Sequence, residues 1–375
     1  MGKIDDLIKE LCPDGVKYVK LGEICEIYDG THQTPKYVNE GIPFISVENI
    51  QNIYGSQKFI SIDDYNSYKI KPQLGDMFMT RIGTIGTCAI VNKQEDIAYY
   101  VSLALLRPNH SIVNVGYLKH LIESNIGVNE IRKHSLLHAV PIKINKNDIC
   151  KIQIPLPPLS IQQQIVEILD TFTDSISNLQ EELALREKQM EYYRENLLSF
   201  DGEEVEWKTL KDVAEIGTGS SNTKDGLSEG LYPFYTRGQE ILRKNEYEYD
   251  EEAIITAGDG VGVGKVIHYT QGKYALHQRA YRFSPMSNLS CKFLFYYMKV
   301  SFFQYVCGNS VSSSVSSLRK PKLMAYPIPV PSLSRQQEIV DILDTFESMI
   351  ANIKEEIELR QKQYEYYREK LLTFD

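Results

Sequence analysis

The sequence contains no long hydrophobic run. Of its 375 residues, 42% are hydrophobic and 24% are charged, which are the proportions of a folded globular protein rather than a disordered chain. No apolar stretch approaches the ~18 residues that a membrane-spanning helix needs. The first ten residues are charged and have no apolar centre, so we expect neither a signal peptide nor a membrane protein.

Cysteine is scarce, and no two cysteines stand in a CxxC pair. The six cysteines are Cys12, Cys25, Cys88, Cys150, Cys291 and Cys307. This scatter argues against a zinc site or a disulfide framework and favours a reduced, cytoplasmic compartment.

Motifs of self-sufficient enzymes are also missing. The sequence has no Asn/Asp-Pro-Pro-aromatic motif for amino methylation, no glycine fingerprint for a nucleoside cofactor, no HExxH and no nucleophile elbow. Residues 258–265 resemble a phosphate-binding loop, but Asp259 replaces its first glycine and Val266 its hydroxyl residue, so we expect a strand, a turn and a strand. His134 and His138 have no third ligand nearby, which favours a structural or DNA-contacting role over a metal site.

Two segments of the chain repeat each other closely. Residues 155–201 align with residues 329–375 at a constant offset of 174 without a gap, and 30 of the 47 positions are identical. The segments begin PLPPLSIQQQIVEILDTF and PVPSLSRQQEIVDILDTF and end EYYRENLLSFD and EYYREKLLTFD. This period is too long for a solenoid, so it indicates a duplicated unit of domain size.

Each repeated segment predicts one long helix. Prolines precede it, and Ser160 with Gln163 and Ser334 with Gln337 have the spacing of a capping box. Apolar residues then recur every seven positions, which is typical of a coiled coil. The predicted seam comprises Ile165, Leu169, Phe172, Ile176, Leu179 and Leu183 in the first helix, and Ile339, Leu343, Phe346, Ile350, Ile353 and Ile357 in the second.

The two seams most simply pair with each other, although each helix could instead pack on its own globular neighbour. The repeat is circular, because Asp14-Gly15 precedes the first globular part as Asp201-Gly202 precedes the second, and the chain stops at the equivalent Asp375. We therefore expect an antiparallel pair of helices with pseudo-twofold symmetry.

The globular parts repeat more weakly; for example, residues 42–45 (IPFI) match residues 232–235 (YPFY). Alternating apolar residues and turn residues predict strands at 42–47, 76–80, 88–91, 99–105, 253–256, 265–269 and 274–283, and helices at 117–123 and 293–305. The fold class is therefore α+β, with mixed and mostly antiparallel sheets.

Charge is divided unevenly along the chain. The net charge is -9, yet residues 159–201 carry -6 and residues 329–375 carry -4, so the globular parts together carry +1. Residues 253–328 hold nine basic side chains and one acidic side chain. A polyanion would be repelled by the helices and accepted by the globular parts, while the acidic helices would face protein or solvent.

Several motifs resemble one known family. They are Asp29-Gly30-Thr31-His32, the segment 41–45 (GIPFI), the turn 80–86 (TRIGTIG) after Gly75-Asp76, and the segment 154–159 (IPLPPL) with Gln162-Gln163 and the run 168–170 (ILD). Together they resemble the DNA specificity subunit of type I restriction-modification systems over essentially the whole chain. The second globular part departs from the pattern, with Thr218-Gly219-Ser220 in place of Asp29-Gly30-Thr31.

The resemblance implies a non-catalytic subunit whose two target recognition domains each read half of a bipartite site in double-stranded DNA. The implied division is a first recognition domain (1–155), a first long helix (156–201), a second recognition domain (202–328) and a second long helix (329–375). The helices would serve as spacer and docking surface for two methyltransferase (modification) subunits, joined by restriction (translocase and nuclease) subunits. S-adenosylmethionine, ATP and Mg would bind to those partners and not to this chain.

Candidate DNA contacts are polar or basic residues on turns near glycines, because such side chains read base edges and phosphates. In the first domain they are His32, Gln33, Thr34, Lys36, Thr80 and Arg81. In the second they are Ser220, Ser221, Asn222, Lys224 and Arg237, with Arg279 and Lys320 for the DNA backbone.

Three other interpretations stay open. The chain could be a coiled-coil adaptor whose globular parts bind no DNA, or a methyltransferase-associated recognition protein of another restriction system. A complete methyltransferase is disfavoured by the missing motifs.

Overall fold

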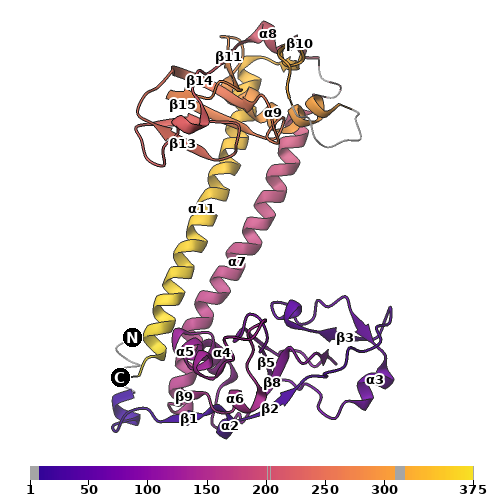
Figure 1. Cartoon of the computed structure of the whole chain (residues 1–375), viewed down its shortest axis with the longest axis vertical. Helices are drawn as coiled ribbons and strands as arrows, with labels where there is room; N and C mark the ends of the chain where they lie inside the picture. Colours follow the sequence, from indigo (N-terminus) through magenta and orange to yellow (C-terminus); the bar gives the residue numbers. More distant parts are fainter. Residues whose placement is uncertain (1–7, 201, 203, 309–316, 375) are drawn as a thin grey trace. The chain divides into compact units, whose positions relative to one another are not determined.

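The structure is a computed structural model that describes residues 8–200, 202, 204–308 and 317–374. Contacts divide the chain into two compact units, residues 1–179 with 356–375, and residues 180–355. Each unit holds one globular part and a section of both long helices, which are labelled α7 and α11 in Figure 1. The units thus cut through both helices, and the four-segment division implied by the resemblance stays a prediction.

The repeated segments form the two long helices as expected. Helix α7 spans Leu159–Leu198 and helix α11 spans Leu333–Leu372, each with 40 residues. The predicted capping boxes are wrong, because the helices begin at Leu159 and Leu333 and so include both serines. The Gln163 side chain instead hydrogen-bonds Asn114 (2.8 Å) and Glu167 (3.3 Å).

Two of the described sheets in the first globular part have more than two strands. Strands β2 (Cys25–Asp29), β8 (Leu103–Pro108), β5 (Met77–Thr80) and β6 (Cys88–Ile90) form an antiparallel sheet in that order. Strands β4 (Phe59–Ile60), β3 (Ile42–Ile45) and β7 (Ala98–Tyr99) form the second, in which β3 and β7 are parallel. The helices are α2 (Leu21–Ile24), α3 (Ile62–Ser67), α4 (Val115–Ile122), α5 (Asn125–His134) and α6 (Lys146–Ile149), with a 3-10 turn η1 at Val47–Asn49.

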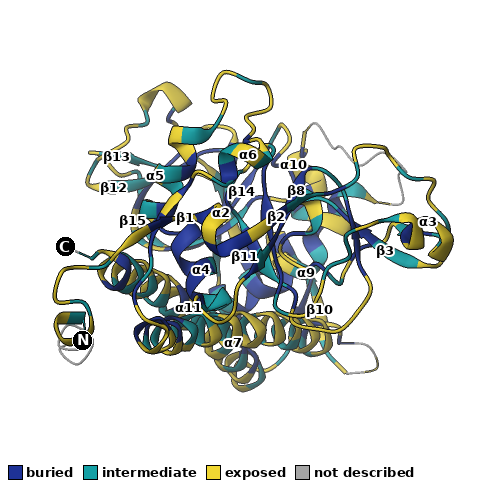
Figure 2. Ribbon diagram, turned by 90° about the horizontal axis from the view of Figure 1, so that it is seen from below, coloured by how far each residue is buried: buried dark blue, intermediate teal, exposed yellow. Residues whose placement is uncertain are grey.

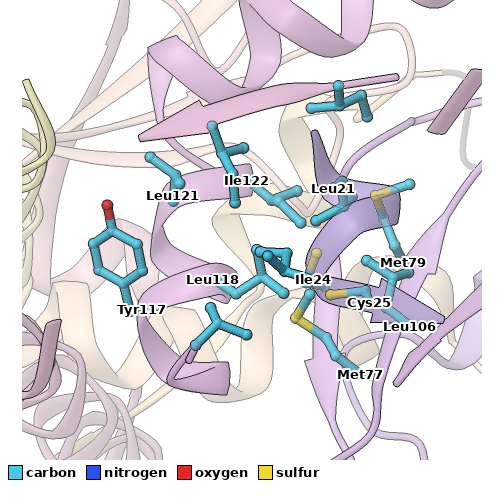
Figure 3. Close-up of a cluster of buried hydrophobic side chains, with 14 of the residues drawn as sticks. Leu21, Ile24, Cys25, Met77, Met79, Leu106, Tyr117, Leu118, Leu121 and Ile122 are labelled. Carbon is cyan, nitrogen blue, oxygen red and sulfur yellow. The ribbon is translucent and has the colours of Figure 1, made fainter. Parts of the chain in front are cut away.

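Helix α4 joins the first sheet to the long helices. Figure 3 shows Leu118, Leu121 and Ile122 of α4 facing Leu21 and Ile24 of α2 in the buried cluster, with Met77, Met79 and Leu106 from the strands. The same cluster takes in Ile161, Ile165 and Leu169 at the start of α7, and Leu371 and Leu372 at the end of α11. The core of this unit therefore includes the start of one long helix and the end of the other.

The second globular part has one six-stranded sheet. The order is β11 (Ala214–Thr218), β16 (Ala280–Pro285), β14 (Tyr249–Ala257), β15 (Ile267–Leu276), β12 (Tyr232–Tyr235) and β13 (Ile241–Lys244), with only β12 and β15 parallel among these pairs. The helices are α8 (Leu210–Val213), α9 (Cys291–Cys307) and α10 (Lys320–Met324), with a 3-10 turn η2 at Thr223–Asp225. Its core holds α9, Ile339 and Leu343 of α11, the last residue of α7, Leu198, and Phe200 beyond it.

Several strand predictions are wrong in their boundaries. The expected strand 274–283 is interrupted at residues 277–279, between the end of β15 and the start of β16. The expected strand 99–105 is interrupted at residues 100–102, where the chain turns from β7 into β8. The expected break before Tyr274 is absent, since Gly272 adopts a φ of +87° inside the continuous strand β15. Glycine is typical of turns, but the left-handed backbone of Gly272 fits within the pair of strands β14 and β15.

The two repeats hold each long helix in the same way. Strands β1 (Tyr18–Lys20) and β9 (Gln153–Pro155) pair before α7, as β10 (Glu206–Thr209) and β17 (Pro327–Val330) pair before α11. Gln162 is fully buried and bonds the Asn114 N–H and the carbonyls of Ile112 and Pro157 at 2.7–3.1 Å. Gln336, 174 residues later, makes the matching three bonds to Ser290, Asn288 and Pro331.

Aromatic stacking shows how the long helices pair within each unit. In the first unit Phe172 stacks on Tyr367 with ring centroids 5.3 Å apart, and in the second Phe346 stacks on Tyr193 at the same distance. Also in the second unit, Glu187 pairs with Lys354 at 2.9 Å. As the α7 position falls from 193 to 187, its α11 partner rises from 346 to 354, so the helices are antiparallel, as predicted.

Seam burial is deepest where the helices pack on the globular parts. Ile165, Leu169, Ile339 and Leu343 are fully buried, and Ile357 is 9% exposed. The remaining predicted seam residues are half-buried, namely Phe172, Ile176, Leu179, Leu183, Phe346, Ile350 and Ile353. Figure 2 shows the contrast between the largely buried strand β8 and the exposed residues along α7.

Candidate nucleic-acid interface

In the first domain, four of the six predicted contact residues lie on one exposed segment that follows β2. His32, Gln33, Thr34 and Lys36 are all exposed. The segment is anchored by Thr31, which exchanges backbone hydrogen bonds with Tyr99 (3.1 Å) and Val101 (3.0 Å). Gly30 is required here, since a Cβ at this position would lie 2.5 Å from the carbonyl oxygen of Tyr100.

The other two predicted contacts in this domain, Thr80 and Arg81, have structural roles instead. Thr80 is 2% exposed, and its hydroxyl accepts from the Thr87 N–H at 3.0 Å. Arg81 is 8% exposed, pairs with Asp29 and donates from Nε to the Ile144 carbonyl at 3.1 Å. A buried arginine satisfied in this way holds the turn together, so we leave both residues out of the proposed interface.

In the second domain, four predicted residues lie on the segment that follows β11, namely Ser220, Ser221, Asn222 and Lys224. Ser220 and Lys224 are exposed. Ser221 is buried, with its hydroxyl bonded to the Glu248 carboxylate and to Lys244 Nζ (2.8 Å). The Asn222 side-chain oxygen accepts from Gln278 Nε2 at 2.6 Å. Ser221 therefore positions the segment, while Ser220, Asn222 and Lys224 are available for contact.

Both segments sit on the same backbone framework. In the first domain the Val101 N–H donates to the Thr31 carbonyl, and in the second the Gln278 N–H donates to the Ser221 carbonyl. In the same way, the Tyr100 N–H donates to the Ile45 carbonyl and the His277 N–H donates to the Tyr235 carbonyl. The backbone N–H of Arg81 donates to the Ser102 carbonyl, and that of Gly258 donates to the Arg279 carbonyl. The Ile144 N–H then donates to the Arg81 carbonyl, and the Leu318 N–H donates to the Gly258 carbonyl. These matching bonds make positions 45, 81 and 102 of the first domain equivalent to positions 235, 258 and 279 of the second. Counting along the chain from the first two pairs makes positions 47 and 82 equivalent to positions 237 and 259.

The equivalent positions carry different side chains. In the first domain they are Val47, Ile82 and Ser102, and in the second they are Arg237, Asp259 and Arg279. Arg237 Nη1 donates to Asp259 Oδ1 at 2.7 Å, and Arg279 Nη1 donates to Asp259 Oδ2 at 3.1 Å. The structure thus brings together Arg237 and Arg279, which the sequence predicted as separate DNA contacts.

Asp259 was missed as a site residue. Its signal in the sequence was its isolation, because it is the one acidic residue between positions 253 and 328. Burial raises the pKa of its carboxyl group, but the two guanidinium groups outweigh this and hold the pKa below its usual value. Asp259 is therefore ionised at neutral pH, and the three residues together carry one net positive charge.

Lys320, the remaining candidate, is exposed at the start of α10. It lies two residues after Leu318, whose N–H donates to the Gly258 carbonyl at 2.8 Å. Gly258 directly precedes Asp259, so this bond brings the start of α10 to the turn that carries Asp259. A hollow of about 350 Å³ beside Arg237 and Asp259 is lined also by Thr223, Thr236 and residues 260–262.

Three other observations concern metal binding, thiol reactivity and membrane insertion. They contain no group of three His, Cys, Asp or Glu side chains that could hold a metal ion. Burial raises the pKa of the Cys25 thiol to about 12, which disfavours the thiolate needed of a nucleophile. No helix among them is long and apolar enough to cross a membrane.

Comparison with known proteins identifies two matching regions. Residues 13–186 and 202–359 each match the family model described as the type I restriction modification DNA specificity domain. The EcoR124I/EcoR124II specificity subunit of Escherichia coli is 34% identical over 255 residues, which cover 60% of this chain and 63% of that protein. A Mycoplasma pneumoniae protein named as a type I specificity subunit is 26% identical over 96% of this chain and 98% of its own length.

Solved structures share the fold. The S subunit of a type I restriction-modification system from M. genitalium has a TM-score of 0.65 at 15% identity, with 96% of each chain covered. A chain from a structure concerned with complex assembly and conformational transition of the type I R-M system has a TM-score of 0.56 at 16% identity, over 96% of this chain and 98% of that one. At these identities the likeness concerns the fold alone.

Proposed function

Because the chain belongs to the family of type I restriction-modification DNA specificity domains, matched twice along its length, we propose that it reads a bipartite site in double-stranded DNA. Each globular part reads one half-site. The observation that carries this proposal is the framework shared by the two domains, on which equivalent positions bear Val47, Ile82 and Ser102 in one and Arg237, Asp259 and Arg279 in the other. An asymmetric site in two parts requires one backbone framework that carries different side chains at equivalent positions in its two copies.

The charge distribution supports the same division of labour. Residues 253–328, with nine basic side chains and one acidic, favour contact with a phosphate backbone. The acidic long helices disfavour it, and so they are the surface for protein partners. The matched packing of α7 and α11 in the two units offers two equivalent surfaces, which suits two methyltransferase subunits.

The chain acts in this proposal without chemistry of its own. The methyltransferase partners supply S-adenosylmethionine, and the restriction subunits supply ATP hydrolysis with Mg. The subunit contributes sequence specificity and the placement of its partners, in the cytoplasm where the DNA is. The two matches to the DNA specificity domain support this role.

The test exchanges residues 15–154 for the matching domain of another subunit of this kind, in the complete complex with its methyltransferase subunits. We expect the methylated sites mapped across a genome to change in one half-site and to keep the other. The reciprocal exchange of residues 202–328 is the matched control and should alter only the second half. Alteration of both halves by one exchange would contradict the division, and a wild-type complex that selects no DNA sequence would favour the adaptor interpretation.

A further inference from the structure

The cluster of Arg237, Asp259 and Arg279 has more donor capacity than its internal contacts use. Asp259 accepts one N–H from each arginine, while each guanidinium carries five N–H donors. Within the described part of the chain, these are the hydrogen bonds found for either guanidinium group. Both groups are accessible, with side-chain exposures of 39% for Arg237 and 61% for Arg279. The unused donors therefore face the surface.

The backbone around the cluster is fixed. The Arg279 carbonyl accepts from the Gly258 N–H at 2.9 Å, which joins the turn before Asp259 to the turn that carries Arg279. The Arg279 N–H donates to His277 Nδ1 at 3.0 Å, and His277 is 4% exposed. Gly262 is required in the same turn, because a Cβ there would lie 2.4 Å from the Arg237 carbonyl oxygen. Both arginines thus project from a rigid base.

An aspartate held between two arginines restricts how their side chains can move. A long side chain loses conformational freedom when it binds, and a contact that holds it beforehand reduces that cost. Asp259 also removes one of the two positive charges, so the cluster has less attraction for phosphate than two free arginines would have. For a phosphate contact this loss of charge opposes the benefit of the fixed side chain, whereas a contact to a base edge depends more on geometry.

Resting on the proposed function, we infer that Arg279 reads a guanine in the half-site of the second domain, with Asp259 and Arg237 as positioning residues. A planar guanidinium can donate in parallel to O6 and N7 of guanine in the major groove, which lysine cannot match. Arg279 is the more exposed arginine and makes the longer bond to Asp259. The first domain carries Ser102 at the equivalent position and does not share this contact.

The experiment uses the full chain in complex with its methyltransferase subunits. Binding is measured on duplexes that carry the mapped site and every single base-pair substitution in the second half-site. Arg279→Ala should lose about 10-fold or more of the discrimination at one G·C pair and keep the other positions unchanged. Arg279→Lys should lose the same discrimination while keeping its affinity for non-cognate DNA, because it retains the charge.

Asp259→Asn separates positioning from mere folding. Removing this negative charge should lower discrimination at the same G·C pair, while affinity for non-cognate DNA stays equal or rises. A purely structural aspartate would instead lower both. Lys211→Ala, which removes an exposed charge from α8 in the same domain, should leave discrimination unchanged.

Several results would overturn the inference. Uniform weakening of all duplexes by Arg279→Ala would make Arg279 a phosphate contact, and an unchanged profile would place it outside the interface. A second half-site with no G·C pair would also exclude it. These outcomes differ from failure of the proposed function, in which the wild-type complex itself would select no half-site. Thermal melting of each variant, with Arg279→Lys as the conservative substitution, separates loss of contact from loss of fold.

Discussion

The two repeats of this chain agree where they hold the long helices and differ where they face solvent. Gln162 and Gln336 make the same three hydrogen bonds, and the stacked rings of Phe172 with Tyr367 and Phe346 with Tyr193 match at 5.3 Å. The candidate DNA-contact regions of the two domains share backbone hydrogen bonds but carry different side chains. The difference shows that packing constrains the helix ends, while the candidate DNA-contact regions can vary without cost to the framework.

Asp170 and Asp344, which occupy equivalent positions in the two long helices, are alike in residue type but differ in their partners. Asp170 of α7 accepts from His120 Nε2 at 2.8 Å, and Tyr364 of α11 bonds His120 Nδ1 at 2.9 Å. The equivalent Asp344 instead accepts from Tyr296 at 2.7 Å and pairs with Lys292. The carboxylate is common to both repeats, but its partners differ in whether they titrate near neutral pH.

The largest expected effect is the loss of a buried glutamine. Gln162→Ala leaves an N–H and two carbonyls without their partner in the interior, so the first unit should lose about 3 kcal/mol of unfolding free energy. Gln336→Ala should cost the second unit the same, since its bonds match. Native-state hydrogen exchange would localise each loss, with Gln337→Ala, an exposed neighbour, as the control. A large loss from one substitution and a small loss from the other would break the equivalence.

A smaller effect is expected from the stacked rings. Phe172→Ala and Phe346→Ala should each destabilise the helix pair by about 2 kcal/mol, less than a fully buried phenylalanine because both rings are half-buried. Double-mutant cycles with Tyr367 and Tyr193 should give coupling energies of about 1 kcal/mol in both units. Urea unfolding followed by circular dichroism measures these values, and unequal couplings would show that only one of the stacks stabilises the pair.

The pH dependence should differ between the repeats. Burial lowers the pKa of His120 below its usual value, although the hydrogen bond to Asp170 opposes this and nearby Lys119 and Glu123 have smaller, opposed effects. A lowered pKa in the folded state means that His120 is neutral there, so its contact with Asp170 is a hydrogen bond rather than an ion pair. The stability it contributes is present above the unfolded pKa of about 6.5 and is lost as the pH falls toward the folded value.

His120→Gln should therefore flatten the fall in stability between pH 7.5 and 5 relative to wild type. Tyr296→Phe, the counterpart in the second repeat, should leave that slope unchanged, because burial raises the pKa of Tyr296 further above 10. Melting temperatures measured across this pH range give the comparison. A slope that stays the same in His120→Gln would show that another group titrates in its place.

The sequence predicted the parts of the fold that follow from periodicity. The alternating steps of four and three through Ile165, Leu169 and Phe172 predicted the long helix, and the circular repeat predicted the antiparallel pairing. Boundaries set by tertiary contacts were not predictable in this way. The left-handed Gly272 inside β15 and the helix starts before Ser160 depend on neighbours that are distant in sequence.

The candidate site was predicted less completely. Glycine-flanked polar residues gave the exposed segments at His32 and Ser220, but the same reasoning included Thr80 and Arg81, which are buried. Composition does not tell which way a side chain points from a turn. Asp259 was noticed only as a mismatch to a phosphate loop, since its two arginine partners lie 22 and 20 residues away in the chain.

The smallest expected effect concerns a charge pair that the repeats do not share. Glu187 and Lys354 pair at 2.9 Å with about half of each side chain exposed, whereas the positions offset by 174 residues are Gln361 and Gln180. An exposed ion pair is worth about 0–1 kcal/mol and is screened by salt, so Lys354→Gln should change stability far less than Phe346→Ala. A double-mutant cycle with Glu187→Gln, at low and high salt, measures the coupling. A coupling that exceeds that of the aromatic stack and persists at high salt would show that charge, rather than the shared apolar seam, holds the helices together.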